Sequence, residues 1–335
     1  MAAVRVVVHG AGSVGCFIGG CWQAAGVPVS FLGRKGFGAE IAEHGLSLSD
    51  FAGWKAHLSD VDYRTDASVL ADADIIALTV KSGATAEAAQ QIADHARDGT
   101  LVVSFQNGIS NLAVLRRELG GRFKIARGII QYNVVHLGEG RFHKAVAGAL
   151  FAEDRPEIRE LAAIVADGPA PLKLSDDMTG IAWGKLLINL NNAVNALSGR
   201  TLLGEFGERD YRRVVAASQH EGLTLLKRAG IQPAKIAAVS PAVLPYVIGS
   251  PNWLFKNVFL RKWKIDEKAR SSMNDDIVGG RKTEVDYING ELVALAERLG
   301  MDAPINRKVV ELIRKAEQGA PALGPAELRR EVLGR

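Results

Sequence analysis

The chain has 335 residues, of which 47% are hydrophobic and 23% are charged. This composition is typical of a globular protein, and the length predicts two domains rather than one. The net charge is +4, from 41 basic and 37 acidic residues, and no run of lysine and arginine is long enough to indicate a nucleic-acid partner.

Two cysteines, Cys16 and Cys21, are too few for a disulfide framework or a cysteine-based zinc site. The seven histidines show no ligand spacing, so we expect no metal. No apolar run of about 18 residues predicts a membrane-spanning helix, and the N-terminus has no leader pattern. We therefore expect a cytoplasmic protein with no membrane partner.

Strands and helices alternate in the first half of the chain. Helices are predicted at residues 13–26 and up to about residue 96. Short β-branched runs predict strands at residues 4–10, 27–34, 73–81, 99–108 and 123–135. The alternation predicts an α/β domain over residues 1–170, with a doubly wound parallel sheet of the Rossmann type.

The alternation stops near residue 166, and residues 166–178 predict a short strand and a linker with two prolines. Beyond them the apolar pattern is helical, which predicts a mostly α-helical substrate domain over residues 171–335. Residues 241–264 are rich in proline and aromatic residues. They predict either a long loop over a pocket or a pair of bent helices.

A glycine-rich turn follows the first predicted strand and opens the first predicted helix. Gly10 allows a tight turn, Gly12 lets the backbone approach a pyrophosphate, and Gly15 lets the helix pack on the strand. The helix N-terminus would then face the phosphates. The predicted cofactor-binding residues of this turn are Gly10, Ala11, Gly12, Ser13, Val14 and Gly15. The alternative interpretation is a glycine-rich turn that holds no ligand.

The end of the second predicted strand distinguishes the two nicotinamide dinucleotides. A site for NAD usually has an acidic residue there, about 20 residues after the turn, which bonds the ribose. Here the strand ends in SFLGRKG, so Arg34 and Lys35 stand at that position. Because a guanidinium binds a 2′-phosphate with two hydrogen bonds, Arg34 favours NADP(H). The alternative is a solvated surface arginine.

Lys81 and Asn107 follow the third and fourth predicted strands. Ligands of open α/β sheets bind outside the carboxyl ends of the strands, so we expect both residues near the cofactor. Asn107, in the sequence QNG, could equally be a turn residue.

The stretch KLLINLNNAVN at residues 185–195 contains one lysine and four asparagines. At about 100° per residue, Lys185, Asn189 and Asn192 share one helix face. The other two asparagines, Asn191 and Asn195, lie off that face. The shared face could bind a ligand rich in oxygen atoms, or it could be a polar seam between helices. In a reductase, a lysine with a lowered pKa could protonate the alkoxide that hydride transfer leaves.

Five motifs occur in order along the chain: the glycine-rich turn, VKSG at residues 80–83, FQNG at 105–108, WGKLLIN at 183–189 and SSMNDDIVGGRKTEVDYINGELVALAERLG at 271–300. Together they resemble the 2-dehydropantoate 2-reductase (ketopantoate reductase) family over nearly the whole chain. The resemblance implies an NADPH-dependent Rossmann domain joined to a helical domain like that of 6-phosphogluconate dehydrogenase. It also implies reduction of ketopantoate to pantoate on the pantothenate route to coenzyme A.

The resemblance assigns a role to each candidate residue. Lys185 matches the proton donor, and Glu284 matches a glutamate at the cofactor end of the catalytic site. The substrate-binding candidates are Asn107, Asn189, Asn192, Ser272 and Asp275. NADPH would be held by the glycine-rich turn, Arg34, Lys81, Asn107 and Glu284.

Three positions depart from the family pattern. The family commonly has a second asparagine eight residues after the lysine, where this chain has Ala193. Asn192 would substitute for it if the helix shifts. Leu203 and Ala269 stand near two further positions at which the family has asparagine. These changes affect substrate contacts more than the cofactor or the proton donor, so they leave the reaction type intact and the identity of the 2-oxo acid open.

Ser272 and Glu284 are twelve residues apart, which is about 18 Å in one straight helix. Both can contact one small substrate only if the chain bends, and Gly279 and Gly280 between them would allow a bend. Otherwise Ser272 binds the acid and Glu284 lies near the nicotinamide ribose. A surface glutamate at the edge of a buried helix face is the alternative for Glu284.

Three functions follow from these residues. The leading hypothesis is NADPH-dependent reduction of ketopantoate in the cleft between the domains, with hydride transferred to C2 and Lys185 as the proton donor. The second is NADPH-dependent reduction of a different small 2-oxo acid. The third is a sensor that binds NADPH without turnover, although a sensor needs no proton donor. We expect a monomer or a homodimer.

Overall fold

A computed structural model describes residues 4–235, 239–259, 266–267 and 269–334 of the chain. Clustering of backbone contacts divides the chain into an N-terminal unit, Met1–Met178, and a C-terminal unit, Thr179–Arg335. The segment at residues 241–264, which the sequence singles out, lies outside the described residues from residue 260 onward.

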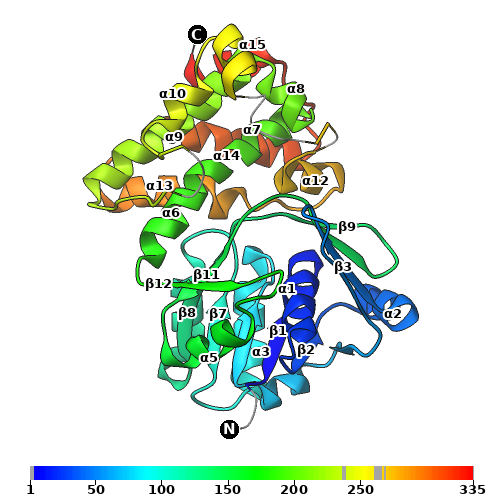
Figure 1. The fold of residues 1–335 in the computed structure, drawn as a ribbon. Coiled ribbons are helices and arrows are strands. Elements are labelled where there is room, and N and C mark those ends of the chain that lie inside the picture. The colour runs from blue at the N-terminus through cyan, green and yellow to red at the C-terminus, as the bar shows by residue number, and fades with distance from the viewer. Residues whose placement is uncertain (1–3, 236–238, 260–265, 268, 335) are drawn as a thin grey trace. The chain divides into compact units, whose positions relative to one another are not determined.

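Eight strands form the main sheet of the N-terminal unit (Figure 1). From one edge to the other they are β5 (Asp62–Arg64), β2 (Val29–Leu32), β1 (Val6–His9), β6 (Ile75–Leu78), β7 (Leu101–Ser104), β8 (Lys124–Ile130), β11 (Leu150–Glu153) and β12 (Leu172–Ser175). The first six are parallel, and numbered among themselves they follow the order 3-2-1-4-5-6 of doubly wound sheets. The predicted parallel sheet is therefore present, and β11 and β12 extend it in the antiparallel direction.

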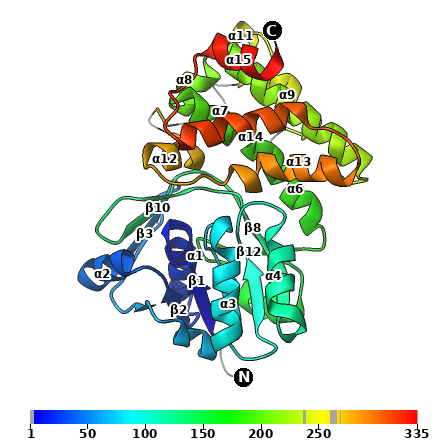
Figure 2. The same ribbon diagram turned by 180° about the vertical axis from the view of Figure 1, so that it is seen from behind.

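Alternate residues of the strands pack on opposite faces of this sheet, because successive side chains of a strand point to opposite sides. Val6 and Val8 of β1 belong to the core that includes α1 (Ser13–Ala24) and α5 (Pro156–Ile164). Val7 belongs to the core on the other face. That face is covered by η1 (Ala67–Asp72), α3 (Thr85–His95) and α4 (Asn111–Leu119). The two faces are seen from opposite sides in Figures 1 and 2.

A second sheet of the N-terminal unit has the order β4 (Lys55–Leu58), β3 (Leu46–Asp50), β10 (Arg141–Lys144) and β9 (Val134–His136). The prediction of one strand over residues 123–135 was wrong, because β8 ends in the main sheet and β9 begins in the second. Between the two strands, Tyr132 is buried and packs edge-on against Phe17 of α1. This contact lies where the chain leaves one sheet for the other. The remaining short helices of the unit are α2 (Lys35–His44), η2 (Ser82–Ala84) and η3 (Gly120–Arg122).

The C-terminal unit is built from helices, as predicted. They are α6 (Met178–Asn189), α7 (Asn191–Ser198), α8 (Leu202–Phe206), α9 (Arg209–Arg228), α10 (Leu244–Ile248), α11 (Asn252–Leu254), the π-helical turn η4 (Phe255–Phe259), α12 (Ser272–Val278), the short η6 (Val285–Tyr287), α13 (Asn289–Arg298), α14 (Pro304–Glu317) and α15 (Pro325–Leu333). β12 still belongs to the N-terminal sheet, so the helical part begins after residue 175 rather than at the predicted residue 171. None of the helices in the described part of the chain is long and apolar enough to cross a membrane.

The long helix α9 is packed by α7, α8, α10, α13, α14 and α15 (Figure 1). Its apolar residues are fully buried at Val214, Val215 and Leu226. A polar link joins it to α14, since the Asn306 amide donates to Oε1 of Glu221 at 2.8 Å. Glu221 also accepts from the backbone N–H groups of the first turn of α14, which satisfies donors that a helix N-terminus leaves unpaired.

Over residues 241–259 the segment contains three short helical pieces, α10, α11 and η4, rather than one long loop or the predicted pair of bent helices. The buried Arg212 of α9 holds these pieces together. Its guanidinium donates to the backbone carbonyls of Ile248 and Ser250 and to the side chain of Asn252. It also lies over the ring of Phe255, 4.2 Å from the ring centroid.

Candidate functional site

The glycine-rich turn connects β1 to α1 at the carboxyl end of the central strand. Gly10 has a φ of +101°, and a Cβ atom there would lie 2.4 Å from the backbone nitrogen of Val80. A Cβ at Gly15 would lie 2.7 Å from Oγ1 of Thr79. At Gly12, in contrast, the nearest atom to an added Cβ is 3.9 Å away. Gly10 and Gly15 are therefore required by packing, whereas Gly12 leaves open space beside the backbone.

The start of α1 fits an anionic ligand. Gly12 is the N-cap residue, it makes no side-chain cap hydrogen bond, and the first turn of α1 has no acidic side chain. The first N–H groups of a helix lack partners within the helix and carry its positive dipole end. Ser13 and Val14 are partly exposed, while Ala11 and Gly15 are buried. These features suit the phosphates of a dinucleotide.

Arg34 lies at the carboxyl end of β2, the strand next to the turn, and its side chain is exposed. Its guanidinium carbon lies 5.7 Å from the centroid of the Phe37 ring. Lys35, which is also exposed, begins α2. The segment thus presents two cations where NAD sites usually carry a carboxylate.

Tyr63 of β5 is a residue that the sequence did not indicate. Its hydroxyl lies 3.0 Å from the backbone oxygen of Ala11 and 3.2 Å from that of Arg34, and it can donate to either. Tyr63 therefore links the glycine-rich turn to the segment that carries Arg34. Burial raises the pKa of its hydroxyl, which keeps it protonated as a donor. No local signal marks this residue, because its role depends on the pairing of β5 with β2.

Lys81 follows β6 and is exposed, and Asn107 follows β7 and is half-buried in a bend. Both strands run parallel to β1, so their carboxyl ends meet at one edge of the sheet. A hydrogen bond of 3.0 Å from Ser82 Oγ to the Asn107 backbone oxygen joins the two loops. Gln106 adds a second link, because its amide donates to Thr85 Oγ1 at 2.7 Å. The predicted turn residue Asn107 thus lies in a loop with buried polar support.

The lysine and asparagine stretch of the C-terminal unit covers the end of α6 and the part of α7 up to Asn195. Lys185, Asn189 and Asn192 are each partly exposed. Asn191 is only 8% exposed and Asn195 is 0% exposed. The burial pattern separates the first three residues from the other two, as the periodicity predicts, but the predicted single helix is wrong, because α6 ends at Asn189 and α7 begins at Asn191.

Burial lowers the pKa of Lys185 to about 8, and the negative charge of Glu284 opposes this change. Glu284 is partly exposed and stands just before η6, so it is not inside a helix. At neutral pH the ammonium group is mostly protonated, yet it loses its proton far more readily than an ordinary lysine. Such a group can act as a general acid near physiological pH.

Ser272 and Asp275 are both exposed on α12, three residues apart and therefore on the same side of the helix. The helix ends at Val278, and Gly280 has a φ of +61° in the left-handed region. Ser272 and Glu284 therefore do not lie on one straight helix, as the two glycines allow. Ser271, which the sequence analysis did not single out, is the N-cap of α12 and accepts from the Asn274 backbone N–H at 3.2 Å.

The three departures from the family pattern fall into two groups. Ala193 is fully buried, so its side chain packs within the unit rather than on the partly exposed face. Asn192 is the partly exposed residue beside it. Leu203 lies half-buried on α8, and the backbone N–H of its neighbour Leu202 donates to the oxygen of Ala269 at 2.8 Å. These two departures therefore lie on backbone segments that this hydrogen bond joins.

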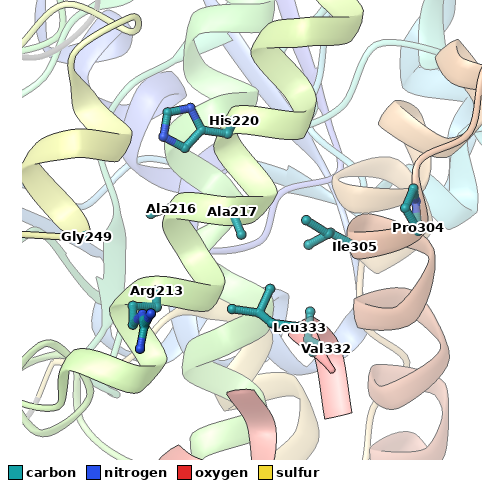
Figure 3. A pocket seen from close by; sticks show the side chains of 9 residues that line it. All are labelled: Arg213, Ala216, Ala217, His220, Gly249, Pro304, Ile305, Val332 and Leu333. Carbon is teal, nitrogen blue, oxygen red and sulfur yellow. The ribbon is translucent and has the colours of Figure 1, made fainter. Parts of the chain in front are cut away.

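A hollow of about 550 Å³ on the C-terminal unit contains none of the predicted site residues (Figure 3). It is lined by Arg213, Ala216, Ala217, His220, Gly249, Pro304, Ile305, Val332 and Leu333. Most of these side chains are apolar or small, and the hollow is wide open. Within the described residues, no group of three or more His, Cys, Asp or Glu side chains could hold a metal ion.

Two family models match the chain. The model described as ketopantoate reductase PanE/ApbA matches residues 6–156, and the model described as ketopantoate reductase PanE/ApbA C terminal matches residues 177–317. A 2-dehydropantoate 2-reductase from Archaeoglobus fulgidus is 28% identical, over 95% of this chain and 100% of its own length.

Solved structures show the same similarity. A PanE/ApbA family ketopantoate reductase from Ralstonia eutropha is 26% identical, with a TM-score of 0.80, over 94% of this chain and 99% of its own. D-Mandelate dehydrogenase, solved with NADH and anilino(oxo)acetate, has the same fold at 19% identity and a TM-score of 0.76, over 94% of this chain and 99% of its own.

Proposed function

We propose that this chain, which belongs to the ketopantoate reductase PanE/ApbA family, is an NADPH-dependent reductase of a small 2-oxo acid, with ketopantoate as the first candidate. The observation that carries the proposal is Lys185 of α6, whose pKa is lowered to about 8 and which is partly exposed, as are Asn189 at the end of α6 and Asn192 near the start of α7. With ketopantoate as substrate, the product would be pantoate on the pantothenate route to coenzyme A.

The N-terminal unit would hold the cofactor. The backbone N–H groups at the start of α1, next to the open Gly12, would bind the pyrophosphate. Arg34 would bind the 2′-phosphate that distinguishes NADPH from NADH. Lys81, Asn107 and, from the C-terminal unit, Glu284 would complete the cofactor contacts. A bound reduced nicotinamide supplies the hydride for C2 of the oxo acid.

The C-terminal unit would bind the acid and supply the proton. Asn189 and Asn192 would donate hydrogen bonds to substrate oxygens, and Ser272 and Asp275 would contact the acid from α12. Lys185 would release a proton from Nζ to the oxygen on C2 as negative charge develops there. Its lowered pKa favours this transfer, and the proton is regained from solvent after each turnover.

A different 2-oxo acid is the second candidate substrate, and one observation favours it. Leu203 and Ala269 lie on backbone segments joined by the hydrogen bond from Leu202 to Ala269, and their side chains cannot form hydrogen bonds. Ketopantoate carries a hydroxyl group that a polar site would recognise, because a buried polar group without a partner is costly. An apolar wall at this place would instead favour a branched or longer 2-oxo acid without that hydroxyl.

A substrate panel tests the function and the cofactor together. The purified chain is incubated with NADPH or NADH and with each of a series of 2-oxo acids, including ketopantoate and its analogue without the hydroxyl group. We expect the highest kcat/KM with NADPH and ketopantoate. A better rate with the analogue would select the second candidate. Binding of NADPH without turnover of any oxo acid would overturn the reductase and favour the sensor.

A further inference from the structure

The asparagines of α7 that face away from Lys185 belong to a buried polar cluster. Asn195 is 0% exposed, and its side chain uses both ends of the amide group. Nδ2 donates to the backbone oxygen of Arg200 at 3.1 Å. Oδ1 accepts from the backbone N–H of Ser271 at 2.9 Å and from the side chain of Asn274 at 3.2 Å. These partners fix which end of the amide faces which group.

The contacts of Asn195 converge on the first turn of α12. Asn274, which is also buried, donates to the backbone oxygens of Asn195 and Arg200, both at 3.0 Å. Ser271 adds a third link, because its hydroxyl donates to the backbone oxygen of Asn192 at 3.0 Å. The residue that follows Ser271 is Ser272, which is exposed. The N-terminus of α12 is thus fixed to α7 by side-chain amides.

Glu205 of α8 supports this cluster from the other side. It is 0% exposed, and it hydrogen-bonds to Asn195 and to Asn191, the latter at 3.4 Å. Burial raises its pKa to about 8, and the two asparagine hydrogen bonds act in the opposite direction. At neutral pH the carboxyl group is therefore mostly neutral, which removes the cost of an unpaired buried charge.

We propose that Asn195 is a positioning residue, which sets the place of Ser272 relative to the Lys185 face by fixing the first turn of α12 to α7. The inference rests on the proposed function, because it assumes that Ser272 binds the oxo acid. The end of α6 and the helix α7 would then serve the site in two ways. Lys185, Asn189 and Asn192 would act on the substrate directly, and Asn195 would act through α12.

The obvious variant is Asn195→Ala, and Asn306→Ala is its matched control. Asn306 is also 0% exposed and is bonded to Ser218, Glu221 and Asn289, which belong to α9 and α13 rather than to α12. Both variants leave buried groups unpaired, so both should lower the melting temperature. We expect only Asn195→Ala to raise KM for the oxo acid, by about tenfold, with the Kd of NADPH changed by less than about twofold.

A milder pair covers the case in which Asn195→Ala does not fold. Ser271→Ala removes the hydroxyl that caps α12 and bonds to Asn192, whereas Ser218→Ala removes a buried hydroxyl that bonds to Asn306 at 2.6 Å. Loss of a cap destabilises the first turn of a helix. We expect Ser271→Ala to raise KM by about threefold and Ser218→Ala to leave it unchanged.

Amide hydrogen exchange gives a readout that does not require turnover. In Asn195→Ala and Ser271→Ala we expect faster amide exchange in α12, with α14 still protected. In the controls Asn306→Ala and Ser218→Ala we expect faster exchange in α14, with α12 still protected. Unchanged exchange in α12 would overturn the positioning role whatever the activity. With an active wild type, a KM that moves equally in Asn195→Ala and Asn306→Ala would overturn it too. A wild type without turnover of any oxo acid would instead overturn the proposed function.

Discussion

The glycine-rich turn of the N-terminal unit offers a ligand backbone groups, whereas the helices α6 and α7 of the C-terminal unit offer side chains. In the turn, Gly10 and Gly15 are dictated by close packing, and Gly12 leaves the helix N-terminus open. In the helices, burial lowers the pKa of Lys185 to about 8. Steric requirements therefore determine the residues of the glycine-rich turn, whereas the cost of burying polar groups determines the properties of the helices.

In the proposed function the two regions have different roles: the glycine-rich turn binds the cofactor, and the helices supply the proton. A backbone site at a helix N-terminus recognises phosphates that many dinucleotides share, and its selectivity comes from a neighbouring side chain such as Arg34. A buried lysine stabilises charge only where it develops during the reaction. We therefore expect changes in the N-terminal unit to alter cofactor affinity, and changes around Lys185 to alter kcat and its dependence on pH.

The largest effect is expected for Lys185→Ala. Without the proton donor, kcat should fall by roughly 10²- to 10⁴-fold, because this is the range that a positioned general acid contributes. The Kd of NADPH, measured by fluorescence titration, should stay unchanged. Lys282→Ala, at an exposed lysine of the same unit, is the control and should keep wild-type turnover. Near-normal kcat in Lys185→Ala would refute its role as donor.

The next effect concerns selectivity for the cofactor. Arg34→Ala should raise KM for NADPH by roughly 10- to 100-fold, because a hydrogen bond to a charged group contributes about 1.5–3 kcal/mol. KM for NADH should change little. The control is Arg64→Ala, an exposed arginine at the carboxyl end of the neighbouring strand β5 that is paired with Asp62. An equal rise in KM for NADPH and for NADH would show that Arg34 does not recognise the 2′-phosphate.

The features that could be predicted from the sequence are each determined by residues that lie close together in the chain. The glycine spacing, the preceding strand and the following helix are consecutive in the chain, and they specify the turn between β1 and α1. The difference in exposure between Lys185, Asn189 and Asn192 and the buried Asn191 and Asn195 follows from helical periodicity. The bend at Gly280 follows from a residue that tolerates a φ of +61°.

The features that could not be predicted join distant parts of the chain. Tyr63 supports the oxygen of Ala11 across 52 residues, and Asn195 accepts from Ser271 across 76 residues. No periodicity or motif marks either residue, because each role arises from tertiary pairing. For the same reason the sequence did not indicate the second sheet, in which β10 pairs with β3.

Tyr63→Phe tests whether the packing of the glycines alone holds the glycine-rich turn in place. The variant loses the hydroxyl that bonds to Ala11 and Arg34 and keeps the ring, which stacks on Phe31. A neutral hydrogen bond contributes about 0.5–1.5 kcal/mol, so the Kd of NADPH should rise by roughly 2- to 10-fold. The kcat at saturating NADPH should not change. An unaltered Kd would show that steric packing alone holds the turn in place.

The smallest expected effect is a shift in the pH dependence of kcat/KM, which tests how charge sets the pKa of Lys185. Lys185 donates as the protonated ammonium, so kcat/KM for reduction should be retained below its pKa and should fall as the pH rises through about 8. The negative charge of Glu284 raises this pKa, because it stabilises the ammonium form. In Glu284→Gln the alkaline fall should therefore begin at a lower pH than in the wild type.

Asp286→Asn is the matched control for this shift. Asp286 is an exposed carboxylate two residues along the chain, and it is paired with Arg314 at 2.7 Å rather than with Lys185. Its variant removes the same unit of charge and should leave the alkaline fall at the wild-type pH. An equal displacement in both variants would mean that net charge, rather than the placement of Glu284, sets the pKa of the donor. A displacement in Glu284→Gln alone would show that the pKa of Lys185 depends on one specific charge, just as the glycine-rich turn depends on specific glycines.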